Sequence, residues 1–227
     1  MSNQESPASA LESLLTRRHS CRSFKPDPVP RERIEEVLRI AQKTASWNNV
    51  QPWQVHIFSG SALERFRDVM LSAATQAGNT SDFPWPTEYR GIYLNRRREC
   101  GFGLYAAVGI QKGDREASGK QAMENFRFFG APHVAIITSD AALNVYGAVD
   151  CGAYVANFLL AAESLGISSI AQGALASKSA VIRQHLGLSE ERRILCGISF
   201  GYEDDAHPAN AYRTTRAPVD EVVRWVD

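Results

Sequence analysis

Apolar residues recur every three or four positions in several segments of this 227-residue chain, which is the spacing of an amphipathic helix. A short helix is predicted over residues 10–17. A second begins at Pro30, because proline suits the first turn of a helix, where its missing N–H is not needed. Its apolar face comprises Ile34, Val37, Leu38 and Ala41. Further helices are predicted over 62–76, over most of 87–128 with an interruption near Gly113, over 147–165 and over 177–186.

Four segments favour β-structure. The sequence WQVHIF at 53–58 mixes β-branched and aromatic residues, which is typical of a strand. The continuous apolar run PHVAIITS at 132–139 predicts a strand buried on both faces. Shorter strands are predicted over 168–171 and 194–201. Because helices outnumber strands and alternate with them irregularly, the pattern favours an α+β layer fold over a regular doubly wound one.

Three segments lack this periodicity. The first ten residues are polar and are predicted to form a flexible tail, which leaves 11–227 as a single domain. Residues 77–86 combine Gly, Asn, Ser, Asp and two prolines, which indicates an exposed loop. From Tyr202 onward the chain is rich in Pro, Asn and Arg. We expect that tail to lie across another surface, either of this chain or of a partner subunit.

Charge and hydropathy argue against several classes of function. The formal net charge is zero and the charges are scattered, so nothing favours nucleic acid or an anionic membrane surface. The longest continuous apolar runs, 158–162 and 134–137, are much shorter than the ~20 residues that span a bilayer. The N-terminus lacks the basic-then-apolar layout of a signal peptide. We therefore expect a cytoplasmic protein without membrane association.

The four cysteines are widely separated, with no C-x-x-C pair and no histidine at ligand spacing. This distribution predicts reduced thiols and neither a metal site nor a disulfide framework. In addition, no G-x-G-x-x-G follows a predicted strand, which disfavours a Rossmann dinucleotide site.

Three polar clusters could carry chemistry. RRHSCRSF at 17–24 concentrates three arginines, a histidine and hydroxyl groups between two predicted helices. Arginine can hold a phosphate through two hydrogen bonds, although a solvated basic helix end is an equally good interpretation. ASWNNVQPW at 45–53 offers side-chain amides that can read a heterocycle edge or a polyol chain, or can simply form a turn. Residues 201–218 add Arg213 and Arg216, which taken alone could be ordinary surface charges.

Four short motifs, taken in their order along the chain, resemble those of a known enzyme family. They are R-x-S-x-R-x-F at 18–24, S-x-x-N-x-Q-P-W at 46–53, SSIAQGA at 168–174 and R-A-P at 216–218. Each is weak alone, but in this order, spread over the whole chain, they resemble the FMN-dependent nitroreductase family. The stretches NFRFFGAP at 125–132 and 212–218 are most similar to its nitrobenzoate reductase branch.

The resemblance implies a fold, a reaction and partners. The fold would have three layers, with a central, mostly antiparallel sheet flanked by helices, in an intertwined homodimer. The enzyme would bind FMN, take electrons from NADH or NADPH and reduce a small nitroaromatic or similar electron-poor compound by a ping-pong mechanism. Alternatives are another flavin reaction on the same fold, such as enone reduction or reductive dehalogenation, and a flavin-binding protein without turnover. Substrate lids in this family fall in the region corresponding to 77–120.

The resemblance also implies roles for individual residues. Arg18 and Arg216 would hold the FMN phosphate with Ser20, and Arg22 would face the flavin N1/O2 edge, where fixed positive charge favours reduction. A backbone N–H of Gly173 or Ala174 would donate to flavin N5, while Ser46, Asn49 and Gln51 would come from the other subunit. The full set expected to bind the cofactor is Arg18, His19, Ser20, Arg22, Ser46, Asn49, Gln51, Asn95, Arg98, Gln172, Gly173, Ala174, Arg213 and Arg216.

The substrate pocket is expected to be lined by Trp47, Asn48, Phe128 and Phe129. Trp47 and Asn48 are bulkier than the pair usual in the family and should narrow the pocket, whereas the two phenylalanines could instead be core residues ahead of a strand. No catalytic side chain is expected, because the flavin carries the chemistry. His133, at a strand start, is expected to be a hydrogen-bonded structural histidine.

Overall fold

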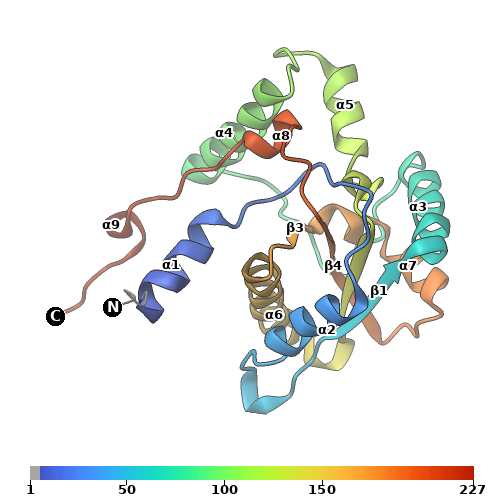
Figure 1. The fold of residues 1–227 in the computed structure, drawn as a ribbon, viewed down its shortest axis with the longest axis horizontal. Helices are drawn as coiled ribbons and strands as arrows, with labels where there is room; N and C mark the ends of the chain where they lie inside the picture. Colours follow the sequence, from blue (N-terminus) through green and yellow to red (C-terminus); the bar gives the residue numbers. More distant parts are fainter. Residues whose placement is uncertain (1–5) are drawn as a thin grey trace.

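The computed structural model describes residues 6–227 as a four-stranded antiparallel sheet with helices on both faces (Figure 1). The strand order is β1-β2-β4-β3. The strands are β1 (Gln54–Ser59), β2 (His133–Asp140), β3 (Ser168–Gln172) and β4 (Arg192–Gly201). The predicted α+β class with an antiparallel central sheet is confirmed.

Strand β2 contributes side chains to the buried clusters on both faces of the sheet. It pairs with β1 on one side and β4 on the other, and its apolar residues alternate between two cores. Ala135 and Ile137 contribute to one buried cluster, and Val134 and Ile136 to the other. Because side chains of a strand point alternately to opposite faces, a strand covered on both sides reads as a continuous apolar run.

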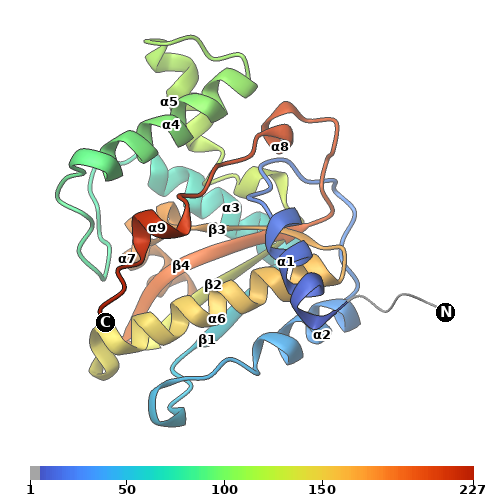
Figure 2. The ribbon, with the colours of Figure 1, turned by 90° about the vertical axis from the view of Figure 1, so that its left-hand side faces the viewer.

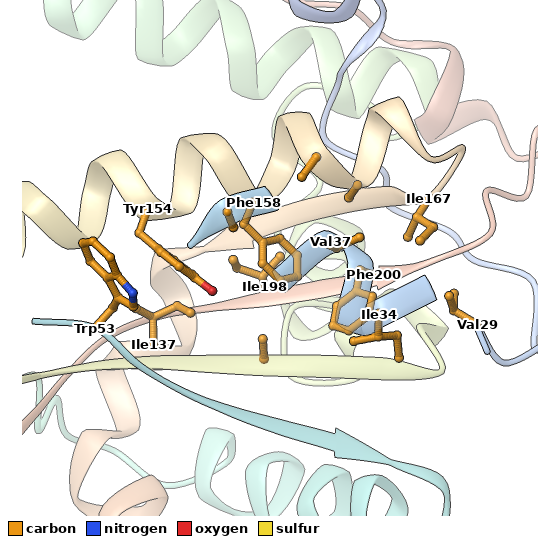
Figure 3. Close-up of a cluster of buried hydrophobic side chains, with 14 of the residues drawn as sticks. Val29, Ile34, Val37, Trp53, Ile137, Tyr154, Phe158, Ile167, Ile198 and Phe200 are labelled. Atoms are coloured by element: carbon orange, nitrogen blue, oxygen red, sulfur yellow. The ribbon is translucent and has the colours of Figure 1, made fainter. Parts of the chain in front are cut away.

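Helices α2 (Arg31–Ala41) and α6 (Asn144–Ser164) cover one face of the sheet. Their buried side chains meet those of β4, as Figure 3 shows for Val37, Phe158 and Phe200. Trp53 stacks on Tyr154 with ring centroids 4.9 Å apart. Helices α3 (Gly60–Ala74) and α7 (Ser179–Leu186) cover the other face around a second buried cluster.

Helix α1 (Pro7–Arg17) begins earlier than its pattern predicted. The Ser6 hydroxyl accepts a hydrogen bond from the Ser9 amide at 3.1 Å, and Pro7 occupies the first turn. An N-cap serine followed by proline is a strong helix start, so the helix includes residues 7–10, which the pattern had assigned to the tail. Positions 1–5, the rest of that predicted tail, lie outside the described residues.

Helices α4 (Gly91–Ala107) and α5 (Arg115–Met123) form a pair that stands away from the sheet (Figure 2). Neither helix has a buried residue. They are separated at 108–114, which agrees with the interruption predicted near Gly113. The C-terminal segment contacts α4 through the short helix α8 (Pro208–Ala211). It then continues to α9 (Val219–Val222). The 3₁₀ turns are η1 (Trp47–Asn49), η2 (Phe128–Gly130), η3 (Ala141–Leu143) and η4 (Gly173–Lys178).

Helix α6 is longer and more apolar than the short continuous runs suggested. Together with η3 it forms a stretch, Ala141–Ser164, that is long and apolar enough to cross a membrane by length and composition. One face, including Cys151, Tyr154 and Phe158, packs on the sheet as in a core helix. Only 33% of the most apolar window is buried, and the helix start exposes large apolar side chains, namely Val145, Tyr146 and Val149.

The loop predicted at 77–86 is not fully exposed. The Asp82 carboxylate is buried against the Arg183 guanidinium of α7, with the interacting atoms 2.5 Å apart. The Lys178 ammonium donates to the carbonyl oxygens of Gln76 and Gly78, both at 2.9 Å. The loop is therefore fastened at its base while its apolar tip, including Trp85, stays exposed.

Candidate active site

Residues 18–24 run along the free edge of strand β3. Ser20 forms a parallel bridge with Ser169, and the Cys21 amide donates to the Ser169 carbonyl at 3.2 Å. In such an extended segment alternate side chains face opposite ways. Cys21 is completely buried, and burial raises the pKa of its thiol to about 12. Ser20 and Arg22, on the other side, remain partly accessible.

The C-terminal segment after β4 fixes the same residues from the opposite direction. The Glu203 carboxylate bonds His19 Nε2 at 2.9 Å and accepts from the Ser168 hydroxyl at 3.3 Å. Phe24 forms an antiparallel bridge with Glu203. His19 therefore helps to hold the backbone of its segment through its side chain, which the sequence pattern did not reveal.

Arg18 and Arg216 bring two positive charges together. Burial and the charge of Arg216 lower the pKa of the Arg18 guanidinium, and Glu163 opposes this shift. Arg216 donates to the Thr214 hydroxyl and the Thr215 carbonyl, each at 2.8 Å. Within residues 6–227, the Arg18 guanidinium has no hydrogen-bond acceptor. The pair concentrates positive charge that Glu163 offsets only in part, and guanidinium groups suit a phosphate.

Arg22 is half-buried, and burial lowers the pKa of its guanidinium. One of its nitrogens donates to the Ser20 carbonyl at 3.1 Å. The side chain lines a cavity of about 520 Å³ between residues 22–24 and helix α5. Phe129 also lines this cavity, although its side chain is only 6% exposed.

Phe128, in contrast, is a core residue. Its side chain has no exposed surface and packs on Phe66 with ring centroids 5.4 Å apart, beneath the Arg67 guanidinium. The prediction that Phe128 lines the substrate pocket is therefore wrong for this chain. Both phenylalanines have left-handed backbone angles, with φ of 60° and 53°, so the turn directs one ring into the core and the other to the cavity.

The loop at 46–51 has an unusually constrained backbone. Asn48, Asn49 and Gln51 have φ values of 49°, 58° and 51°, a conformation that costs free energy for residues with a Cβ. The Ser46 hydroxyl holds the turn by accepting from the Gln51 amide at 2.9 Å. The Gln51 side chain donates to the Asn49 carbonyl at 3.1 Å. Strain that is maintained by hydrogen bonds is common at functional sites.

Trp47 projects from this loop over the start of α6. Its ring meets Tyr146 edge to face at 4.4 Å, and its amide donates to the Asp150 carboxylate at 3.1 Å. These residues, with Asn48, surround a cavity of about 270 Å³. The indole is 54% exposed, so it can form the wall of a neighbouring site.

The two groups of predicted residues do not meet within one chain. In both ribbon views, residues 18–24 and α8 lie toward one end of the molecule, and the loop before β1 lies at the other (Figures 1 and 2). The loop that carries Ser46, Asn49 and Gln51 therefore lies apart from the segments that carry Arg18 and Arg216.

The remaining residues predicted to bind the cofactor differ in how accessible they are to a ligand. Asn95 and Arg98 are exposed on α4, Gly173 is exposed and Ala174 partly so. The Gln172 side chain is buried, donates to the Asn125 carbonyl at 2.8 Å and accepts from the Ser199 hydroxyl. It is thus occupied within the protein. The Arg213 guanidinium donates to the Asn210 and Tyr212 carbonyls.

Sequence reasoning missed residues that act through the fold. Glu203 and Asn210 hold the two arginine-bearing segments together, and Arg96, rather than Arg98, pairs with Glu221 at 3.0 Å. Arg96 and Arg216 line a cavity of about 540 Å³ between α4 and the C-terminal segment. No local pattern marks such residues, because their partners lie more than one hundred positions away.

Comparison with known proteins decides which family this geometry represents. Residues 15–202 match the model of the nitroreductase family. This chain belongs to the nitroreductase family. It is 36% identical to nitroreductase NfnB of Mycolicibacterium smegmatis over 96% of this chain and 93% of that protein. It is 34% identical to a 4-nitrobenzoate reductase of Nocardioides sp. over 96% and 90%.

A solved structure agrees with this assignment. The FMN-dependent nitroreductase NfnB from Mycobacterium smegmatis, in complex with NADPH, superimposes with a TM-score of 0.93 at 35% identity. The match covers 98% of this chain and all of that one. The resemblance drawn from the four motifs, including its nitrobenzoate reductase branch, and the predicted class of oxidoreductase are confirmed.

Proposed function

We propose that this nitroreductase is a homodimer that binds FMN, oxidises NADH or NADPH and reduces nitroaromatic compounds of the nitrobenzoate or nitrophenol type by a ping-pong mechanism. The observation that carries the proposal is the pair of arginines, Arg18 and Arg216, which come from opposite ends of the chain and lie near enough for the charge of Arg216 to lower the pKa of Arg18. Its relatives include a 4-nitrobenzoate reductase and an FMN-dependent nitroreductase in complex with NADPH, which supports the same activity.

The residues present fit the phosphate of FMN. Arg18 and Arg216 supply two guanidinium groups, and Ser20 lies on the accessible side of the same segment. Two like charges this close destabilise each other, and a phosphate between them would convert that repulsion into two attractions. The expected gain is larger because Arg18 is partly desolvated.

Other residues would orient the flavin ring and stabilise charge on it. When bound, FMN would accept a hydride from the nicotinamide and pass the electrons to the nitro group. Arg22 carries its positive charge at a half-buried position with its geometry fixed by the Ser20 carbonyl. A preorganised cation of this kind stabilises negative charge on a neighbouring ring without having to rearrange.

A second copy of the chain would complete the site. The 46–51 loop lies at the opposite end of the molecule from residues 18–24, and its constrained backbone would present Ser46, Asn49 and Gln51 to a neighbour. Exposed apolar side chains on α6 and the C-terminal segment, Val145, Val149, Val222 and Trp225, supply the surface that such a dimer would bury.

An anaerobic titration tests the proposal. The purified protein, reconstituted with FMN, is titrated with NADH or NADPH while the visible flavin absorbance is followed, and 4-nitrobenzoate is then added. Bleaching by the nicotinamide and recovery with the nitro compound are the two halves of the predicted cycle. A protein that cannot be loaded with FMN would refute the assignment. Light scattering after size exclusion tests the dimer separately.

A further inference from the structure

Asn210 of α8 uses its side-chain oxygen and both hydrogens of its side-chain nitrogen in bonds that join distant segments. Its Oδ1 accepts from the Arg22 amide at 2.6 Å, and its Nδ2 donates to the Ser23 carbonyl at 2.8 Å and the Asp204 carbonyl at 2.9 Å. The residue is only 2% exposed, so these bonds are shielded from water. Bonds of this kind contribute most to geometry when every polar atom is satisfied.

The segments that Asn210 joins carry both halves of the arginine pair. On one side, the amide and carbonyl it binds belong to the extended stretch that continues back to Arg18. On the other, its own backbone carbonyl accepts from the Arg213 guanidinium, and Arg216 follows three residues later. A parallel bond from the Ser23 hydroxyl to the Asp204 carboxylate, at 3.1 Å, reinforces the same junction.

We infer that Asn210 is a positioning residue that holds the N-terminal and C-terminal arginines at the spacing a phosphate requires. The inference rests on the proposed function, because it assigns the ligand of that pair as the phosphate of FMN. The reason is electrostatic: the positive charges of Arg18 and Arg216 repel each other and Glu163 offsets this only in part, so contacts elsewhere must help to maintain their approach. Asn210 supplies buried contacts between the two segments that carry these arginines.

A purely structural role makes a different prediction. If Asn210 only stabilised the fold in general, its loss would weaken the binding of both flavins alike or of neither. If it spaces the two arginines, its loss should weaken FMN, which has the phosphate, and spare riboflavin, which does not. The ratio of the two affinities therefore distinguishes the roles, without any measurement of turnover.

The test compares apo-protein titrated with FMN and with riboflavin by quenching of flavin fluorescence. In Asn210→Asp the carboxylate keeps the acceptor for the Arg22 amide but cannot donate to the two carbonyls. We expect the dissociation constant for FMN to rise about tenfold and that for riboflavin to stay constant, since a lost buried donor typically costs that much. Arg18→Ala is the benchmark for complete loss of one phosphate contact.

Two further variants keep the test decisive. Leu63→Ala removes a buried side chain from the opposite core and serves as a stability control, with the affinity ratio unchanged. Ser23→Ala removes only the bond to Asp204, so it should shift the ratio in the same direction by less, even if Asn210→Asp fails to fold. Equal weakening of both flavins, or an unchanged ratio in both Asn210→Asp and Ser23→Ala, would overturn the inference. A wild-type protein without preference for FMN over riboflavin would instead refute the proposed phosphate site.

Discussion

The Asp82 carboxylate and the Arg183 guanidinium form a buried ion pair that links the 77–90 loop to helix α7. The side chains are 6% and 8% exposed, respectively. Asp82 also accepts from the Ile194 amide of β4 at 2.7 Å, so one carboxylate ties a loop, a helix and a strand together. The pair fixes the base of the region that precedes α4.

Asp82→Asn should destabilise the protein substantially. The amide has no charge, so the substitution leaves the Arg183 guanidinium buried without its carboxylate, and breaking a buried ion pair typically costs about 3–5 kcal/mol. The Asn side-chain oxygen can still accept from the Ile194 amide, so the free energy of unfolding should fall by about 2–4 kcal/mol. Urea denaturation measures it. Glu116→Gln, which breaks an exposed ion pair with Lys120, is the matched control and should change the midpoint very little.

His133 should make stability depend on pH. Burial lowers the pKa of its imidazole, and Nε2 accepts from the Val29 amide at 2.9 Å, so the neutral ring is the one the fold requires. The unfolded chain takes up a proton near the ordinary value of about 6.5, whereas the folded protein does so only at lower pH. Stability should therefore be fully present above about pH 6.5 and decline as pH falls through the lowered folded pKa.

Thermal melts of wild type and His133→Gln between neutral and acidic pH test this. The variant should melt at a lower temperature at neutral pH but lose less stability on acidification. His56, whose pKa burial and Arg192 also lower, should leave part of the slope in place. An identical slope in the two proteins would show that His133 does not contribute.

The parts of this protein that were predictable from sequence are those whose cause is local. Apolar periodicity located the strands and the core helices, since the burial that selects those residues repeats along each element. The motif at 18–24 was predictable because all of its polar residues lie within one stretch of seven residues.

The rest depends on partners far away along the chain. Phe128 and Phe129 are adjacent and chemically identical, yet a left-handed turn sends one into the core and the other to a cavity. Asn210 reads as a tail residue because its partners, Arg22 and Ser23, are nearly two hundred positions away. Composition cannot encode either relation, since both arise only after the sheet has formed.

Substitution by alanine should change the stability of the protein in opposite directions at Gly101 and at Gly103, although both residues lie in α4. A Cβ on Gly103 would lie 2.5 Å from the Tyr212 ring, whereas one on Gly101 meets nothing within 4 Å. Alanine at 101 should stabilise α4 by up to about 1 kcal/mol through its helix propensity. Alanine at 103 must displace Tyr212, with an overpacking cost of about 1–3 kcal/mol.

The pair is tested by chemical denaturation together with FMN titration. Because Tyr212 lies between Asn210 and Arg213, its displacement should also weaken FMN binding in Gly103→Ala, while Gly101→Ala binds as wild type does. Equal stability and equal affinity in the two variants would contradict the close contact between α4 and the C-terminal segment.

Trp47 should set the size of the substrate that the proposed site accepts. Its indole is held edge to face on Tyr146, and its amide is fixed by Asp150, so the ring is a rigid wall rather than a mobile one. Trp47→Ser should raise kcat/KM for a bulky dinitroaromatic relative to 4-nitrobenzoate by about tenfold, which corresponds to about 1.4 kcal/mol of relieved steric cost.

The rate of flavin reduction by NAD(P)H separates this effect from general damage. If the wall affects only the acceptor, stopped-flow reduction of Trp47→Ser should match wild type while acceptor selectivity changes. Trp47→Phe keeps an aromatic ring against Tyr146 and should preserve most of the wild-type selectivity. Unchanged selectivity in Trp47→Ser would place the indole outside the substrate path, and slower reduction together with unchanged selectivity would point to a misplaced flavin. Losses of stability or of cofactor content affect kcat/KM for both acceptors equally, so they cancel in the ratio that measures selectivity.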